Sequence, residues 1–241
     1  MCPSKYLEAG IKEISDGELQ KLLSSKINEL SLTIKGTYIE ASIAQLYQEL
    51  EQSGISFKPK TYLTDEWGCP NRVPVIGIPF YLANPKLFKL ISQITGLKVK
   101  NDAEVMMLLR HEAGHTFNYA YHLYRKPEWR LLFGLFSQPY KADYQPVPFS
   151  ANFVNHLSGW YAQKHPEDDF AETFAVWLTP NSEWQKQYSH TPALAKLLYI
   201  DKMIRKYGQQ PPDITDGKLD IPVKDMTMTV EAWCKKRMCL P

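Results

Sequence analysis

The sequence contains no apolar run that approaches the roughly 20 residues of a membrane-spanning helix. It also lacks a strong excess of charge of either sign, because 28 Lys and Arg residues nearly balance 26 Asp and Glu residues, which leaves a formal net charge of +2. A charge this small does not indicate binding to nucleic acid or to an anionic membrane. We therefore expect no nucleic acid and no membrane among the partners of this protein.

Cysteine is scarce as well, with only Cys2, Cys69, Cys234 and Cys239 in the chain. The spacing of Cys234 and Cys239 is within the range of metal ligands, but no second close pair accompanies it. We interpret all four as ordinary reduced thiols. The N-terminal stretch lacks the charged start and the following apolar segment of a secretory signal, which favours a cytoplasmic protein.

The composition is that of a soluble globular protein, with 241 residues of which 44% are hydrophobic and 22% charged. Extended structure is predicted over residues 55–58, 61–63 and 73–82. Apolar periodicity and capping residues predict helices over residues 15–31, 37–53, 84–95, 101 to before Pro127, 166–178, 192–207 and 229–238. The sequence therefore predicts an α+β fold, with a small sheet and a largely helical C-terminal part.

The segment from Val73 to Leu82 is rich in β-forming residues but contains Pro74 and Pro79. Because proline cannot donate a hydrogen bond to a neighbouring strand, we expect this strand at the edge of the sheet. An exposed edge can bind an extended peptide as an additional strand. Alternatively, the prolines only protect the edge against aggregation, and both interpretations stay open.

The stretch LRHEAGHTF contains the pattern HExxH within the long predicted helix. Residues four apart share a helix face, so His111 and His115 can bind one metal ion. Glu112 projects about 100° away from His111 around the helix axis, where it can take a proton from a water on the metal. The pattern also occurs by chance in unrelated helices, in which both histidines are simply packed and hydrogen-bonded. The apolar turn before it and the strong helix prediction favour a zinc site.

Gly114 lies between the two histidines. A glycine inside a helix costs about 1 kcal/mol relative to alanine, so its presence requires a reason. Its missing side chain leaves room for a substrate or for a neighbouring backbone to approach the helix at this point.

A second helix, predicted over residues 166–178, supplies candidates for the third protein ligand that a catalytic zinc site needs. Asp168 and Glu172 are four residues apart and share one face, so one can bind the metal while the other accepts a hydrogen bond from a ligand histidine. Asp169 is a third choice, because it points about 100° away from Asp168. Alternatively, the acids of this first turn only complement the helix dipole. His156 and His165 are expected in loops or behind the ligands.

The two motifs, HEAGH and PEDDFAETFA, resemble those of gluzincin-type zinc metallopeptidases. The resemblance is closest to the group named "putative zinc-binding metallopeptidases" and more remote to lethal-factor-type peptidases. It implies one zincin-like catalytic domain over residues 1–241, with an N-terminal helical part (1–54), a sheet with the HExxH helix (55–126) and a C-terminal helical part that supplies the third ligand (127–241).

The resemblance also implies roles for individual residues. In such proteins the third ligand is an acid on a second helix, and a supporting acid commonly follows four residues later, which assigns Asp168 as ligand and Glu172 as its supporter. The ligand is normally glutamate in this group, and aspartate is one methylene shorter, so Glu172 stays open as the direct ligand. Relatives often place a tyrosine near the metal, as Tyr161 would be, where its hydroxyl can donate to an oxyanion. Alternatively, Tyr161 is only a packed aromatic residue, and both interpretations stay open.

These observations together predict a Zn²⁺-dependent hydrolase, a metallopeptidase that acts on a peptide or protein substrate. His111, His115 and either Asp168 or Glu172 hold the metal, and Glu112 is the general base. The alternative is a non-catalytic binding or regulatory module that keeps a zincin-like fold and a metal for structure. The presence of Glu112 counts against this alternative, because a structural site does not require a base.

Overall fold

The computed structural model describes residues 15–98, 101–140 and 143–238, so Cys2 and Cys239 lie outside the described residues. Its helices and strands in chain order are α2 (Asp16–Ser24), α3 (Tyr38–Gln52), β1 (Lys60–Thr64), β2 (Val75–Pro79), α4 (Pro85–Thr95), α5 (Asp102–Ala120), α6 (Pro127–Phe133), α7 (Pro166–Leu178), α8 (Trp184–Gln187), α9 (Ala193–Tyr207) and α10 (Val230–Met238). Helices and a small sheet confirm the α+β prediction at this level. No helix of the described part is long and apolar enough to span a membrane.

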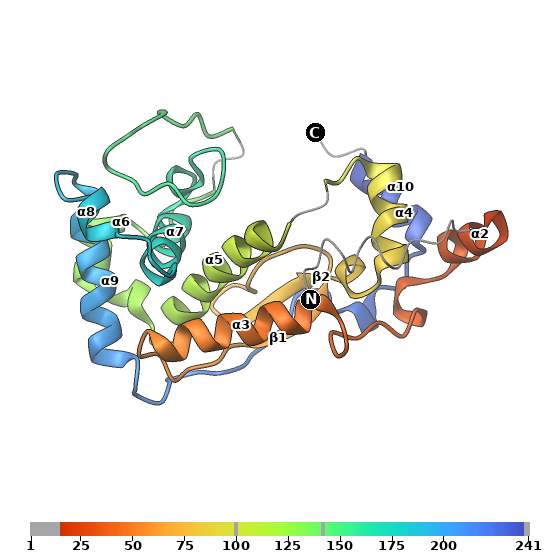
Figure 1. Ribbon diagram of the computed structural model, residues 1–241, viewed down its shortest axis with the longest axis horizontal. Helices are drawn as coiled ribbons and strands as arrows, with labels where there is room; N and C mark the ends of the chain where they lie inside the picture. Colours follow the sequence, from red (N-terminus) through yellow and green to blue (C-terminus); the bar gives the residue numbers. More distant parts are fainter. Residues whose placement is uncertain (1–14, 99–100, 141–142, 239–241) are drawn as a thin grey trace.

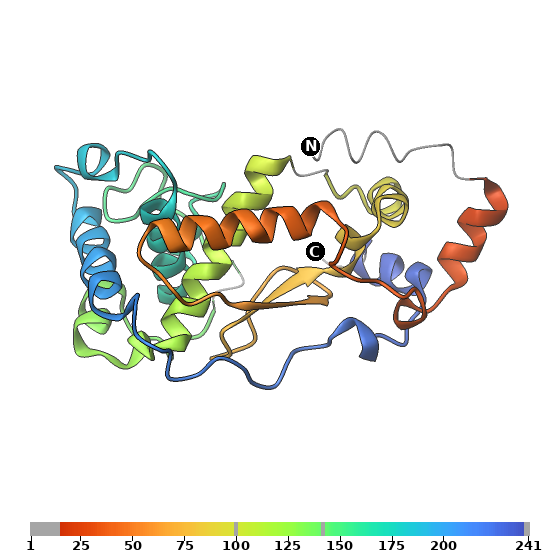
Figure 2. The same cartoon turned by 60° about the horizontal axis from the view of Figure 1, so that its bottom comes forward.

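The long helix α5 runs through the middle of the molecule, and α3 lies alongside it and the two strands (Figures 1 and 2). Asn101 begins α5 with a capping box, in which its side chain accepts from the Glu104 backbone N–H and the Glu104 carboxylate accepts from the Asn101 N–H. The helix ends at Ala120 instead of continuing towards Pro127, because the chain turns at His122, where φ is +49°. The separate helix α6, which starts at Pro127, was not predicted from the sequence.

Strands β1 and β2 pair in parallel, with Tyr62 opposite Gly77 and Thr64 opposite Pro79. Every residue of β2 is buried, and its other edge is not open, because the Gly77 N–H donates to the Gly68 carbonyl over 2.7 Å. The strand thus lies at the edge of the two-stranded sheet, as expected, but the expectation that this edge is exposed is wrong at Gly77. The backbone around Gly68 lies where an added peptide strand would have to pair.

Helices α5 and α7 pack against each other at Gly114. A Cβ atom on Gly114 would lie 2.8 Å from the Cα atom of Ala171 and 3.0 Å from its carbonyl oxygen. Aromatic side chains continue this interface, with Phe117 against Phe174 at 5.4 Å between ring centroids. The close approach of a neighbouring backbone is thus the reason for the glycine, as one of the two sequence interpretations held.

We expect Gly114→Ala to lower the free energy of unfolding by about 2 kcal/mol, because the added methyl group would meet backbone atoms that cannot move aside. Denaturant unfolding monitored by circular dichroism measures this change. Gly17→Ala is the matched control, since a Cβ there meets no atom within 4 Å and alanine favours the helix by up to about 1 kcal/mol. A Gly114→Ala protein as stable as its parent would contradict the tight crossing.

Candidate metal centre

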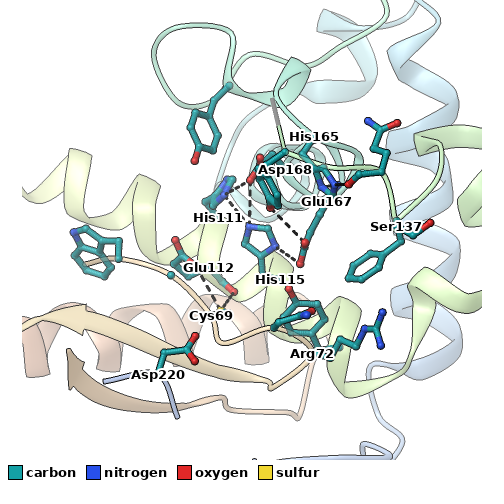
Figure 3. A pocket seen from close by; sticks show the side chains of 18 of the residues that line it. Cys69, Arg72, His111, Glu112, His115, Ser137, His165, Glu167, Asp168 and Asp220 are labelled. Carbon is teal, nitrogen blue, oxygen red and sulfur yellow. Dashed lines mark hydrogen bonds and ion pairs between the residues drawn. The ribbon is translucent and has the colours of Figure 1, made fainter. Parts of the chain in front are cut away.

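Three buried side chains from α5 and α7 converge on one point. The Nε2 atoms of His111 and His115 lie 3.0 Å apart, and Oδ1 of Asp168 lies 3.8 Å from the first and 3.7 Å from the second. His111 and His115 are one helical turn apart on α5, and Asp168 lies in the first turn of α7, which faces them across the crossing at Gly114 (Figure 3).

This arrangement fits a divalent cation. Bonds of 2.0–2.1 Å in a tetrahedral zinc site place the ligand atoms about 3.3 Å apart, close to the separations of the three atoms found here. Two imidazole nitrogens and a carboxylate directed at one point are a typical ligand set for this ion. Oδ2 of Asp168 is also buried and has no hydrogen-bond partner in the described part of the chain. The residues present therefore suit Zn²⁺.

A carboxylate also holds the far side of each imidazole. Nδ1 of His111 donates to Oε1 of Glu172 over 2.8 Å, and Oε2 of Glu172 accepts the backbone N–H groups of His156 and Leu157 at 3.2 and 2.8 Å. These contacts place Glu172 behind His111 and leave Asp168 beside both Nε2 atoms. The geometry thus favours the assignment in which Asp168 is the ligand and Glu172 the supporter.

Glu167 has the corresponding position behind His115, with Oε1 3.3 Å from Nδ1. Sequence reasoning did not single out Glu167. Glu167 lies next to Asp168 in the acidic first turn of the helix. Acidic residues are favourable there because of the helix dipole, so the sequence offers no reason to assign Glu167 a further role. The only signal in the sequence was the run of three acids, and only the direction in which α7 approaches α5 shows which acid meets which histidine.

The electrostatics of the two imidazoles differ. Burial and the neighbouring His115 lower the pKa of His111 to about 3. Burial alone would also lower the pKa of His115, but the hydrogen bond and charge of Glu167, with Glu112 and Asp168 nearby, raise it to about 9. Burial raises the pKa of Asp168 to about 6. Without a metal, therefore, one proton on His115 supplies the positive charge between these groups at neutral pH.

Glu112 and Tyr161 line the same cavity of about 700 Å³. The carboxylate of Glu112 accepts a hydrogen bond from the Cys69 thiol at 3.5 Å, and Glu112 lies next to His111 in the chain without joining the three converging side chains. The ring of Tyr161 lies 5.5 Å from that of His111, and its hydroxyl accepts from Nζ of Lys164 at 3.2 Å. Burial raises the pKa of Tyr161, so it remains a neutral phenol that can donate.

The remaining candidates lie outside the three converging side chains. Asp169 forms a buried ion pair with Lys196 of α9 at 2.6 Å, which removes it as a ligand. His165 caps α7, where its Nδ1 accepts the Glu167 N–H and its Nε2 donates to the Gln138 carbonyl. His156 donates from Nε2 to the Met107 carbonyl at 3.0 Å. His156 and His165 are thus both held by backbone groups and are not among the converging side chains, although His165 lines the cavity.

A family model described as "Putative zinc-binding metallo-peptidase" matches residues 104–234 of the chain. The protein belongs to this zinc-binding metallopeptidase family. The resemblance that the two sequence motifs carry is thereby confirmed. Searches of curated proteins and of solved structures found no match. The part that matches this metallopeptidase family includes both HEAGH on α5 and the acidic turn of α7, so the three converging side chains all lie within it.

We expect Asp168→Ala to abolish stoichiometric zinc binding, because it removes one of three ligand atoms from a buried site. Glu172→Gln should keep the metal but weaken its binding by about 10–100-fold, as is usual when the partner of a ligand histidine is changed. Zinc competition with a chromophoric chelator measures both. Full zinc affinity in Asp168→Ala together with complete loss in Glu172→Gln would reverse the two assignments.

Zinc binding at pH 7 should release about one proton. His115 has a pKa of about 9 in the metal-free protein, so it is protonated at pH 7 and must lose that proton to bind a metal. The affinity for zinc should rise with pH up to about 9 and then level off. Titration calorimetry in two buffers of different ionisation enthalpy counts the proton, and equal heats in both buffers would contradict the protonated state.

Proposed function

We propose that this protein is a zinc-dependent peptidase in which His111, His115 and Asp168 bind the metal and Glu112 is the general base. The observation that carries the proposal is the convergence of three ligand atoms on a point that opens into a cavity of about 700 Å³ beside Glu112. A structural metal site is closed, whereas a catalytic one keeps a position open for water and substrate. Membership of the metallopeptidase family supports the same reaction class.

A bound Zn²⁺ would supply Lewis-acid chemistry, since it polarises a carbonyl group and lowers the pKa of water towards 7. The carboxylate of Glu112 accepts the proton of the attacking water and passes it to the leaving amine. Glu172 accepts the Nδ1 proton of His111, and the carboxylate of Glu167 lies 3.3 Å from Nδ1 of His115, so that both rings can present Nε2 lone pairs to a metal.

The hydroxyl group of Tyr161 is suited to stabilise the oxyanion that forms as water adds to the peptide carbonyl. Lys164 donates to its oxygen, so the O–H group itself is left to donate into the cavity. A neutral phenol is required for this role, and the burial of Tyr161 favours the neutral form. Asp168 lies on α7, a second helix that follows the HExxH helix α5 in the chain. This order also supports a gluzincin-type arrangement, with aspartate in place of the usual glutamate.

The rival function is that of a binding or regulatory module in which the metal serves only the structure. Glu112 lines the cavity wall, where its carboxylate accepts a hydrogen bond from the Cys69 thiol. It forms no ion pair with a cation in the described part of the chain. A buried carboxylate costs free energy in such a place, and general-base catalysis gives it a purpose. A chelator that unfolds the protein, with no casein hydrolysis before chelation, would favour the module.

We expect Glu112→Gln to keep stoichiometric zinc and to lower kcat on denatured casein by about 10²–10⁴-fold, which is the usual contribution of a general base. The amide keeps the size of the side chain but cannot accept the proton. Zinc content by atomic absorption, measured on the same sample as the hydrolysis rate, separates loss of the base from loss of the metal. A variant as active as its parent would remove Glu112 as the base.

A further inference from the structure

A second cavity, of about 690 Å³, continues from the one at the metal centre. The two share Arg72, Phe136 and Ser137 in their walls. Arg72 and Ser137 appear together at one side of the close-up, beyond His115 (Figure 3). The second cavity therefore lies next to the one at the metal centre, where a bound peptide chain could reach it.

Four cationic residues line the second cavity, and we call them the basic groove: Arg72, Arg125, Lys126 and Arg130. Within the described part of the chain, none of the four forms an ion pair with a carboxylate. The one acid on α6, Glu128, is bound to Lys202 at 2.8 Å. A cluster of positive charge without counter-charges is unfavourable in the free protein and attracts anions.

Arg72 is held in place at the junction of the two cavities. Its guanidinium group lies 5.6 Å from the ring centre of Tyr124 and 5.4 Å from that of Phe136, and these rings stack on each other at 4.5 Å. The residue has a φ of +61°, in a turn closed by the hydrogen bond from the Val73 N–H to the Pro70 carbonyl. Such a backbone favours glycine, and a strained non-glycine residue is characteristic of functional sites.

The charge of the cavity walls is also asymmetric. Asp220 lines the metal-site cavity as well, and Figure 3 shows it and Arg72 on opposite sides of Cys69. Exposed Leu131 and Leu135 stand beside the cations of the second cavity. The basic groove thus offers a guanidinium group held on aromatic rings, further cations and apolar surface on one side of the metal centre.

We propose that the basic groove binds carboxylate side chains of the substrate on one side of the scissile bond, with Arg72 as the contact nearest to the metal. The substrate class is then a peptide that carries acidic and apolar residues on that side. This inference rests on the proposed peptidase function. A guanidinium group held on aromatic rings loses little freedom when it binds a carboxylate through two parallel hydrogen bonds, and the leucines suit a peptide better than a nucleic acid.

The test measures binding to the zinc-loaded Glu112→Gln protein, so that no turnover is needed. The probes are two fluorescein-labelled decapeptides that differ only in three residues, glutamate in one and glutamine in the other. We expect the glutamate peptide to bind about tenfold more tightly by fluorescence anisotropy, and the difference to shrink at high salt. Arg72→Gln, added to Glu112→Gln, should remove most of the difference.

Lys236→Gln is the matched control, because it removes one exposed charge on α10, far from α6 in Figures 1 and 2, and should leave the preference intact. The double change Arg125→Gln and Arg130→Gln affects only exposed side chains and tests the groove even if Arg72→Gln does not fold. Equal affinity for the two peptides, or equal effects of Arg72→Gln and Lys236→Gln, would overturn the proposal.

Two further outcomes separate the basic groove from the proposed peptidase function. Tight binding of a single-stranded oligonucleotide or of phosphatidylserine vesicles, without discrimination between the peptides, would also overturn the proposal and assign the groove to another anion. A parent protein that hydrolyses neither peptide, while Glu112→Gln binds the glutamate peptide through Arg72, supports the groove and counts against the peptidase. If the parent hydrolyses both, Arg72→Gln should raise KM for the glutamate peptide and leave kcat nearly unchanged.

Discussion

The contact between Gly114 and Ala171 is the constraint on which the metal centre depends. Helices usually pack with their axes 8–10 Å apart, at a distance set by the side chains between them. Here one of the two helices has no side chain at the contact, and its missing Cβ would lie 2.8 Å from the Ala171 Cα. Because aspartate has a short side chain, Asp168 reaches the His111 and His115 rings only if α7 approaches this closely. The glycine of α5 and the short aspartate of α7 therefore fit the same close approach of the two helices.

The same approach explains how so many titratable groups can be buried together. Isolated charges are costly in a protein interior unless they are paired and hydrogen-bonded. Each buried acid of α7 has a partner on another element: Glu172 has His111 and two backbone N–H groups, Glu167 has His115, and Asp169 has Lys196. Oε1 of Glu167, Oδ2 of Asp168 and Oδ1 of Asp169 are buried without a hydrogen-bond partner in the described part of the chain. Of the three, Asp168 lies beside the Nε2 atoms of both histidines, so a cation there would give its carboxylate a partner.

The sequence was sufficient to predict most helices and the two halves of the site. Helix α7 begins and ends where it was predicted, and α5 begins at its predicted cap, because capping and apolar periodicity are local properties of the chain. The errors concern non-local structure. The turn at His122 that separates α6 from α5 carries no glycine or proline of its own, and the cover of β2 by Gly68 depends on a single pair of backbone hydrogen bonds. Likewise, the contact of Glu167 with His115 and the basic groove form only when segments distant in the sequence pack together.

A further buried pair shows how the position of His111 is tied to the rest of the fold. Its neighbour Arg110 donates two hydrogen bonds, of 2.7 and 2.8 Å, to the carboxylate of Glu49 on α3. A buried ion pair adds little net stability, since the desolvation of both groups offsets their attraction. It does, however, tolerate only one mutual orientation, because the planar guanidinium group must face both oxygens at once. Arg110 therefore restricts the rotation of α5 about its own axis through its contact with α3. With that rotation restricted, the next residue, His111, points towards Asp168, so α3 contributes to the metal geometry although it supplies no ligand.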